Sequence, residues 1–363
     1  MLQFKNQTAD QLARALADLQ PPPRLIRQLH SAVLRQDWTE LPRVWPSTSP
    51  RLLDQLRQRT EIPRLTPLER AVSTTDGFVR YAFRGDDSAR FEAVCIPLLH
   101  RPEDPKYVAC VSSQVGCALG CVFCATGRLG FRRQLATWEI VDQVVRLQAD
   151  AAHPIRGVVF MGMGEPLLNY EAVMRAAAVL SEPCGLAIAA KAITISTVGI
   201  VPAIRRFTAE RQPYRLIVSL TSAIPERRRA LLPIEQNYPL PELFAALRDY
   251  QRATRRRLTL AWTVLGGINT SREEARALAR IVGDLPVQLD LIDVNDPTGQ
   301  FRRAAADELA AFRDALREEL GQPVIRRYSG GQDIRGGCGM LAGTVDLPAP
   351  PPELAPLIPR VNS

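Results

Sequence analysis

Three cysteines, Cys117, Cys121 and Cys124, stand close together in the stretch GCALGCVFCATG, with the spacing C-x3-C-x2-C. The stretch directly follows an apolar run, YVACVSSQV, which is typical of a β-strand. Three thiolates on one tight loop can bind three irons of a cubane 4Fe–4S cluster and leave the fourth iron open to a ligand. A zinc site would need a fourth ligand and favours paired cysteines or cysteine–histidine sets, which are not found here. The spacing therefore favours an iron–sulfur cluster that binds a substrate.

Polar and glycine residues stand at the ends of further apolar runs. MGMGEP (161–166) ends one run, and its glycines would let the backbone approach a ligand closely. Ser196, the segment 219–221 and Asn295 end three others. Each of these alone is more typical of a turn residue that caps the next helix. Because they recur beside the cysteine loop, we expect them to contact a ligand of the cluster.

The elements that would position these residues alternate between strands and helices. The apolar runs are near-continuous in Val, Ile and Leu, as expected where helices cover a parallel sheet. The expected strands are 107–115, 157–163, 192–199, 214–220, 258–265 and 287–294. The expected helices are 138–151, 170–181, 200–211, 241–256, 272–285 and 306–320. Six units fall short of the eight of a closed barrel, so we predict an α/β fold, a partial (β/α)6 barrel with its site at the carboxyl ends of the strands.

The chain divides into four predicted regions. Residues 1–64 are expected to form a small helical accessory domain, interrupted by three consecutive prolines. Residues 65–100 alternate like a pair of strands around the turn GDDS and lead into the core. The barrel is expected over 101–345, and the Pro-rich tail 346–363 is expected to be disordered.

The net charge is +8, carried almost entirely by arginine. Arginine suits phosphate and can stack on bases, so RNA is a natural partner, although a biased codon usage with a solvated surface would give the same composition. Three scattered histidines make a histidine-based metal site improbable. The apolar runs are too short to span a membrane, and no secretory signal is evident at the N-terminus, so we expect a cytoplasmic protein whose cysteines are metal-binding or catalytic.

Several blocks together resemble the radical S-adenosylmethionine (SAM) superfamily and, within it, the RNA adenine methyltransferases that modify ribosomal and transfer RNA. The matching blocks are FEAVCIP (91–97), CVSSQVGCALGCVFCATGRLGFRRQL (110–135), GVVFMGMGEPLLNY (157–170), ITISTVGIVP (193–202), VSL (218–220) and GGQDIRGGCGMLAG (330–343). The resemblance implies that the open iron of the cluster chelates SAM and that SAM cleavage starts radical chemistry.

The resemblance also implies roles for individual residues. Cys338 matches the cysteine that becomes S-methylated, Cys110 its partner in a transient disulfide, and Glu92 the general base that accepts a proton. The positions that match SAM contacts are Gly164, Glu165, Ser196, Ser219, Leu220, Thr221 and Asn295.

The implied reaction explains why such parts are needed. An adenine ring carbon, C2 or C8, is not nucleophilic and cannot attack a SAM methyl group directly. In the family, two SAM molecules are used per turnover. One methylates the cysteine, and the other yields a radical that abstracts hydrogen from that methyl group. The resulting methylene adds to the ring, the base removes the ring proton, and the second cysteine releases the product. An electron donor such as flavodoxin or ferredoxin is an implied partner.

This sequence departs from the family at Thr221, where histidine is usual, and in the loops DVNDPTGQF and GGQD. These loops face the substrate, so an alternative is a radical SAM enzyme that acts on a peptide or small molecule. A second alternative is a zinc-stabilised RNA-binding module without catalysis. The Cys338, Cys110 and Glu92 set favours the methyltransferase. Cys95 and Cys184 receive no role.

Overall fold

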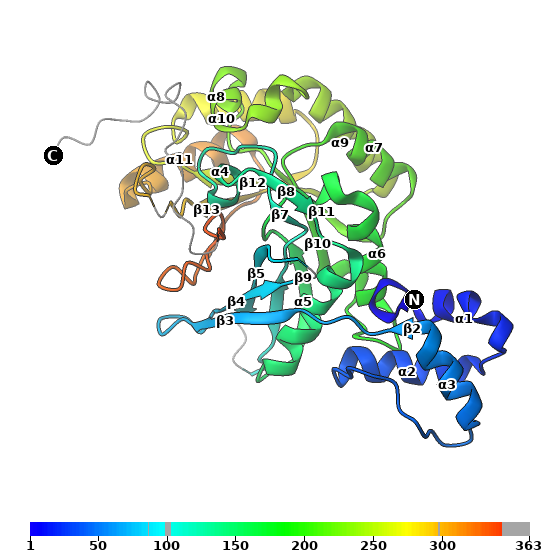
Figure 1. Cartoon of the computed structure of the whole chain (residues 1–363). Helices are drawn as coiled ribbons and strands as arrows, with labels where there is room; N and C mark the ends of the chain where they lie inside the picture. The colour runs from blue at the N-terminus through cyan, green and yellow to red at the C-terminus, as the bar shows by residue number, and fades with distance from the viewer. Residues whose placement is uncertain (86, 99–102, 297, 343–363) are drawn as a thin grey trace.

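One open sheet of ten strands forms the centre of the computed structural model, which describes residues 1–85, 87–98, 103–296 and 298–342 (Figure 1). The strand order is β14-β13-β12-β11-β10-β9-β6-β5-β4-β3, so β14 and β3 are its two edges. The strands are β3 (Thr66–Val72), β4 (Val79–Arg84), β5 (Arg90–Pro97), β6 (Tyr107–Cys110), β9 (Ile155–Phe160), β10 (Ile193–Thr197), β11 (Arg215–Ser219), β12 (Leu258–Val264), β13 (Val287–Asp293) and β14 (Val324–Arg327).

The strands from β6 to β14 are parallel to one another, and helices cover them on the outside. Strands buried by helices are apolar throughout, which is why the sequence predicted them well. The helices that follow the strands are α5 (Thr137–Asp150), α6 (Tyr170–Ser181), α7 (Val201–Ala209), α9 (Leu240–Thr254), α10 (Arg272–Val282) and α11 (Ala306–Leu320). The predicted α/β partial barrel is confirmed.

Two strand predictions differ from the structure. The parallel strand β14 was not predicted, because as an edge strand it buries only Val324 and exposes the three residues that follow. The expected single strand 107–115 instead ends at Cys110 and restarts as β7 (Gln114–Gly116), which pairs with β8 (Phe131–Gln134). Ser113 leaves the main sheet because its backbone N–H donates to the carbonyl of Met163 at 2.8 Å. This turn brings the cysteine loop over the end of the barrel.

The sheet continues beyond β6 as three antiparallel strands, β5, β4 and β3. Val94 on β5 is the register partner of Cys110 on β6. Glu92 lies two residues from Val94 along β5, so its side chain points to the same face of the sheet as that of Cys110. The antiparallel extension therefore brings a carboxylate and a thiol that are distant in sequence to one face.

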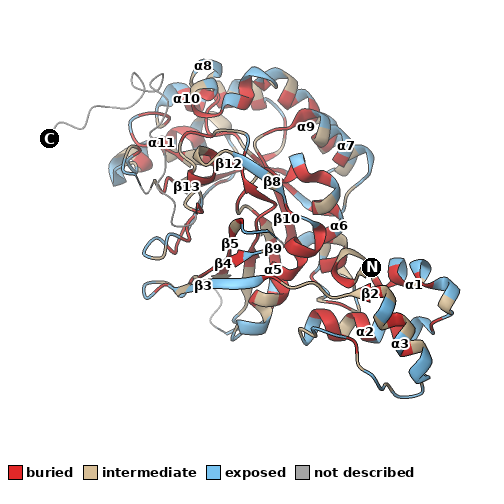
Figure 2. Cartoon of the chain, viewed as in Figure 1, coloured by how far each residue is buried: buried red, intermediate tan, exposed pale blue. Residues whose placement is uncertain are grey.

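The N-terminal helices pack beside the barrel at α5 and α6 (Figures 1 and 2). They are α1 (Ala9–Ala15), α2 (Pro23–Arg35) and α3 (Pro50–Arg59), with short strands β1 (Leu2–Gln3) and β2 (Thr60–Glu61). Lys5 and Asp142 form a fully buried ion pair of 2.5 Å, and the backbone N–H of Leu65 donates to the same carboxylate at 2.7 Å. Because a lone buried charge is costly, this pair ties the first residues of the chain to α5.

Two further predictions concern the ends of the chain and its surroundings. The predicted disordered tail 346–363 lies outside the described residues. Among the helices of the described part, none has the length and apolar character needed to cross a membrane.

Candidate active site

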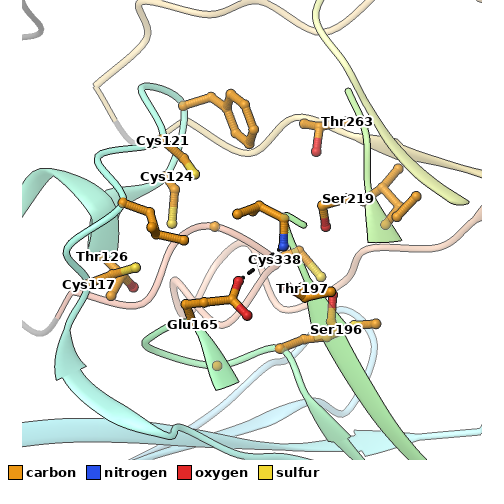
Figure 3. A pocket seen from close by; sticks show the side chains of 18 of the residues that line it. Cys117, Cys121, Cys124, Thr126, Glu165, Ser196, Thr197, Ser219, Thr263 and Cys338 are labelled. Carbon is orange, nitrogen blue, oxygen red and sulfur yellow. Dashed lines mark hydrogen bonds between the residues drawn. The ribbon is translucent and has the colours of Figure 1, made fainter. Parts of the chain in front are cut away.

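A cavity opens at the carboxyl ends of the parallel strands, where barrels of this kind hold their ligands (Figure 3). Its empty volume, mouth included, is about 1010 Å³. This is at the upper end of the roughly 300–1,000 Å³ of small-molecule sites. The predicted site residues that line it are Cys117, Cys121, Cys124, Gly164, Glu165, Ser196, Ser219, Asn295 and Cys338.

The three clustered cysteines form one wall of the cavity, and their loop is braced from several sides (Figure 3). The backbone N–H of Cys117 donates to the carbonyl of Gly130 at 3.0 Å, and that of Val122 donates to the carbonyl of Leu231 on α8 (Pro225–Leu231) at 3.2 Å. Gly116 has a φ of +73°, and a Cβ there would lie 1.8 Å from the Gly130 oxygen. The loop can therefore close only with glycine at this position.

The chemistry of the donor set suits an iron–sulfur cluster, because such clusters are held by cysteine thiolates. Within the described residues, no three side chains of His, Cys, Asp or Glu form a group that could hold one metal ion. Burial raises the pKa of the Cys117 thiol to about 12 and that of Cys121 well above its ordinary value. Metal binding deprotonates a coordinating thiol outright, which offsets this effect.

Glu165 follows β9 and lies in the same cavity, near Cys117 (Figure 3). Its carboxylate accepts the backbone N–H groups of Leu167 and Val198, both at 3.0 Å. Burial raises the pKa of Glu165 to about 7, although these hydrogen bonds act in the opposite direction. The preceding Gly164 has a φ of +102°, and a Cβ there would lie 2.6 Å from that of Gln114. Only glycine fits at position 164, and the backbone conformation that it allows leaves Glu165 facing the cavity.

Residues 219–221, at the end of β11 and just after it, lie partly in the cavity and partly in the core. Ser219 lines the cavity, whereas Leu220 and Thr221 are fully buried and are not part of its described lining. Thr221 has a φ of +62°, which is strained for a β-branched residue. Asn269 holds this conformation by donating its side-chain amide to the Thr221 carbonyl at 2.7 Å. The hydroxyl of Thr221 is buried without a hydrogen-bond partner among the described residues.

Cys338 enters the cavity on the segment that follows β14, and its side chain is exposed to the open space there (Figure 3). Its backbone N–H donates to the Ser329 hydroxyl, and its carbonyl accepts from the Asn295 amide, both at 3.3 Å. Burial among protein atoms raises the pKa of the Cys338 thiol, Ser329 lowers it, and charge on Cys124 raises it. Cys338 therefore shares the cavity with the three clustered cysteines.

Cys110 and Glu92 lie behind the cavity rather than in its described lining. Cys110 ends β6 and is 7% exposed. Burial raises the pKa of its thiol, and charge on Cys338 raises it further, so the two thiols are neighbours. Glu92 is buried and paired with Arg80 on β4. All seven cysteines are free thiols, and Cys95 and Cys184 do not belong to the described lining of the cavity.

Several lining residues were missed by the sequence analysis. Thr197, Thr263 and Asp293 stand at the ends of β10, β12 and β13. The strand-end rule that selected Ser196 and Asn295 could have found them. Thr126 lies two residues after the last cluster cysteine, and its hydroxyl donates to the Leu341 carbonyl. Only the tertiary fold brings that C-terminal partner near, so no sequence signal pointed to it.

Comparison with known proteins places this geometry in a family. Residues 111–279 match the profile of the radical SAM superfamily. A probable RNA methyltransferase of Myxococcus xanthus is 49% identical, over 94% of this chain and 95% of that protein. A dual-specificity RNA methyltransferase RlmN of Syntrophobacter fumaroxidans is 41% identical, over 79% of this chain and 82% of that protein.

A solved structure agrees with the sequence comparison. The crystal structure of a radical SAM methyltransferase from Sphaerobacter thermophilus superposes with a TM-score of 0.85 and 35% identity, over 94% of this chain and 99% of that one. The family uses a 4Fe–4S cluster and SAM, and the cavity described above has the thiols and the space for both. The chain therefore belongs to the radical SAM superfamily and, within it, to the family of RNA methyltransferases.

Proposed function

We propose that this enzyme methylates a ring carbon of adenine, C2 or C8, in ribosomal or transfer RNA, through an S-methylcysteine on Cys338. The observation that carries the proposal is the position of Cys338: it lies in the same cavity as Cys117, Cys121 and Cys124, with Cys110 as its neighbour. A methyl carrier must reach both the site where SAM binds and the substrate. A thiol exposed to the cavity on a glycine-flanked segment meets this requirement.

The residues that would hold the cofactors follow from their places in the cavity. Cys117, Cys121 and Cys124 would bind the cluster, and the strand-end residues opposite them would contact SAM. When bound, the cluster and two SAM molecules per turnover supply the methyl group and the one-electron chemistry that activates it. A donor such as flavodoxin or ferredoxin would provide the electron.

The chain's own residues then handle the carbon and the protons. The Cys338 sulfur carries the carbon that becomes bonded to the adenine ring. Glu92 accepts the proton that leaves the ring, and its ion pair with Arg80 holds it in place on the face of the sheet shared with Cys110. The Cys110 sulfur attacks the Cys338 sulfur to form the S–S bond. The S–C bond breaks, its electron pair stays with the carbon, and a proton completes the methyl group.

RNA as the substrate is supported by the names of the relatives and by the charge of the chain. Both sequence relatives above bear the name of an RNA methyltransferase, the first as a probable one. The net charge of +8 suits a polyanion. The target adenine would have to leave its stack to reach a cavity of this depth, as happens in other enzymes that modify bases.

The test is mass spectrometry of nucleosides from the RNA of a strain that lacks the gene, compared with the parent strain. We expect one methyladenosine isomer, with the methyl group on C2 or C8, to disappear and to return when the purified enzyme acts on RNA from the deletion strain. An unchanged nucleoside profile, together with SAM cleavage by the purified enzyme, would point to a peptide or small-molecule substrate.

A further inference from the structure

The segment that carries Cys338, residues 329–342, is here called the carrier loop. If Cys338 carries the methyl group, as proposed above, its sulfur must face SAM, then the RNA, and finally Cys110. The loop must therefore be held in place without being locked. The structure shows two anchors, one on either side of Cys338, and only the second one involves the cluster region.

The first anchor is Asp76, in the turn between β3 and β4. Its Oδ2 atom accepts the hydroxyl of Tyr328 and the backbone N–H of Gly331, each at 2.8 Å. Its Oδ1 atom accepts the backbone N–H of Phe78 within the turn, at 3.3 Å. One carboxylate thus joins the hairpin to the start of the carrier loop, across most of the length of the chain.

The contact around Asp76 is tightly built. A Cβ on Gly330 would lie 2.2 Å from the Asp76 carboxylate, so only glycine allows this approach. The rings of Phe78 and Tyr328 meet edge to face at 6.2 Å. In the reverse direction, Asp333 of the loop accepts the backbone N–H of Thr74 in the hairpin at 3.1 Å.

Asp76 is also charged in this setting. Partial burial raises the pKa of its carboxyl group, but hydrogen bonds from Ser73, Gly331 and Tyr328 outweigh that effect and hold the pKa below its usual value. Hydrogen bonds to an ionised acceptor are stronger than those between neutral groups. The turn therefore offers the loop a strong acceptor.

The second anchor is α4 (Ala125–Arg128), directly after the cluster cysteines. The backbone N–H of Ala125 donates to the carbonyl of Gly339 at 2.7 Å, and the Thr126 hydroxyl donates to the carbonyl of Leu341. Between the two anchors, Cys338 makes two hydrogen bonds of 3.3 Å, to the Ser329 hydroxyl and from the Asn295 amide. Cys338 thus lies between the two anchors and directly before the second one.

We propose that Asp76 is a positioning residue for the carrier thiol: it clips the carrier loop to the β3–β4 hairpin and so holds Cys338 within reach of both the cavity and Cys110. The antiparallel extension then has two tasks, since β5 supplies Glu92 and the β3–β4 turn sets the place of the thiol. Substrate contact is not part of the role of Asp76.

Loss of the clip should change the behaviour of one thiol. In Asp76→Ala, holding its cluster, we expect a bulky maleimide to label Cys338 at least fivefold faster, measured on its peptide by mass spectrometry. The Cys110–Cys338 disulfide should form at least threefold more slowly with a mild oxidant. The kcat for RNA should fall about as much as the disulfide rate, with KM unchanged. Asp76→Asn, which keeps one carbonyl acceptor, should lie between Asp76→Ala and wild type.

Two further variants control the experiment. Tyr328→Phe leaves Asp76 in place and removes one of its two bonds to the loop region, so it should shift labelling and disulfide formation in the same directions by a smaller factor. Asp249→Asn makes the same chemical change on α9, where the exposed Asp249 pairs with the exposed Arg252 of the same helix, and should match wild type. Iron content and melting temperature show whether each variant is folded.

The outcomes separate this proposal from the one on which it rests. If folded Asp76→Ala and Tyr328→Phe both label, oxidise and turn over like wild type, the clip has no positioning role and the proposal is wrong. If Cys338→Ala still methylates RNA, the carrier function is wrong, and the labelling and oxidation rates still report whether Asp76 holds the loop. If all variants, Asp249→Asn included, lost disulfide formation and turnover equally, the proposal would also be wrong, because the losses would not depend on the contact between Asp76 and the carrier loop.

Discussion

Two groups of cysteines lie in or directly behind one cavity, and the chain holds them in opposite ways. Cys117, Cys121 and Cys124 lie on one short loop, which is braced by backbone bonds to the residue before β8, to α8 and to the C-terminal segment. Cys110 and Cys338 come from distant parts of the chain, one on a central strand and one on a loop. Ligands of a resident cluster must stay fixed relative to one another, whereas two thiols that join and separate must belong to elements that can move apart.

The largest effect is expected on the fixed side. Replacing any one of Cys117, Cys121 and Cys124 by Ala should abolish both iron binding and SAM cleavage, because three thiolates are the minimum set for this cluster. Iron content and 5′-deoxyadenosine formation are measured under anaerobic conditions. A variant that kept full iron and cleaved SAM would show that the cysteine is not a ligand.

Variants of Cys338 and of Cys110 should show two different defects in methyl transfer. Cys338→Ala removes the carrier, so no carbon reaches RNA. Cys110→Ala leaves the carrier but removes the attacking thiolate on which disulfide exchange depends, so a covalent enzyme–RNA adduct should accumulate. Glu92→Gln should also stall as an adduct. A denaturing gel after ribonuclease treatment detects the nucleotide-bearing band, which should be absent from the Cys338→Ala/Cys110→Ala double variant. Normal turnover by Cys110→Ala would make Cys110 an ordinary core residue.

A smaller effect is expected from Glu165, which lies in the same cavity as the three clustered cysteines. Its pKa of about 7 in the folded protein exceeds its ordinary value of 4.5, so the folded state keeps a proton that the unfolded chain releases. Its contribution to stability is therefore fully present below pH 4.5 and is lost as pH rises through 7, by about 3 kcal/mol. Urea unfolding without SAM should show the Glu165→Gln variant gaining on wild type by this amount between pH 4.5 and 8. A pH-independent difference would mean that folding does not raise the pKa of Glu165.

The smallest effect is expected at Thr221, which is buried behind Ser219 and has a strained backbone conformation. Thr221→Gly should relieve the strain of the positive φ and remove a buried hydroxyl that has no hydrogen-bond partner among the described residues. Against this, glycine has more conformational freedom in the unfolded chain, which lowers stability. We expect a net gain of about 1 kcal/mol in the free energy of unfolding. Thr259→Gly, within β12, is the matched control and should destabilise. A loss of stability at both positions would mean that packing of the Thr221 methyl group outweighs the strain.

Many helices and strands of the fold could be predicted from local sequence patterns. Helices α6 and α11 begin and end where the sequence predicted, because amphipathic period and helix ends are local properties. β14 escaped prediction because an edge strand rich in arginine has no apolar signature. The break after Cys110 also escaped it, because apolar residues continue across a turn whose cause is a contact with Met163.

The sequence by itself predicted which cysteines would bind a cluster, and it determined the order of the parallel strands around them, since a cluster loop needs only close spacing in the chain. Tertiary structure alone decided three other matters: that Leu220 and Thr221 are buried behind Ser219, that Arg80 holds Glu92, and that Asp76 clips the carrier loop. Each depends on which strand lies beside which and on which face a side chain points to. Such relations join residues far apart in the chain, and no local period or spacing encodes them.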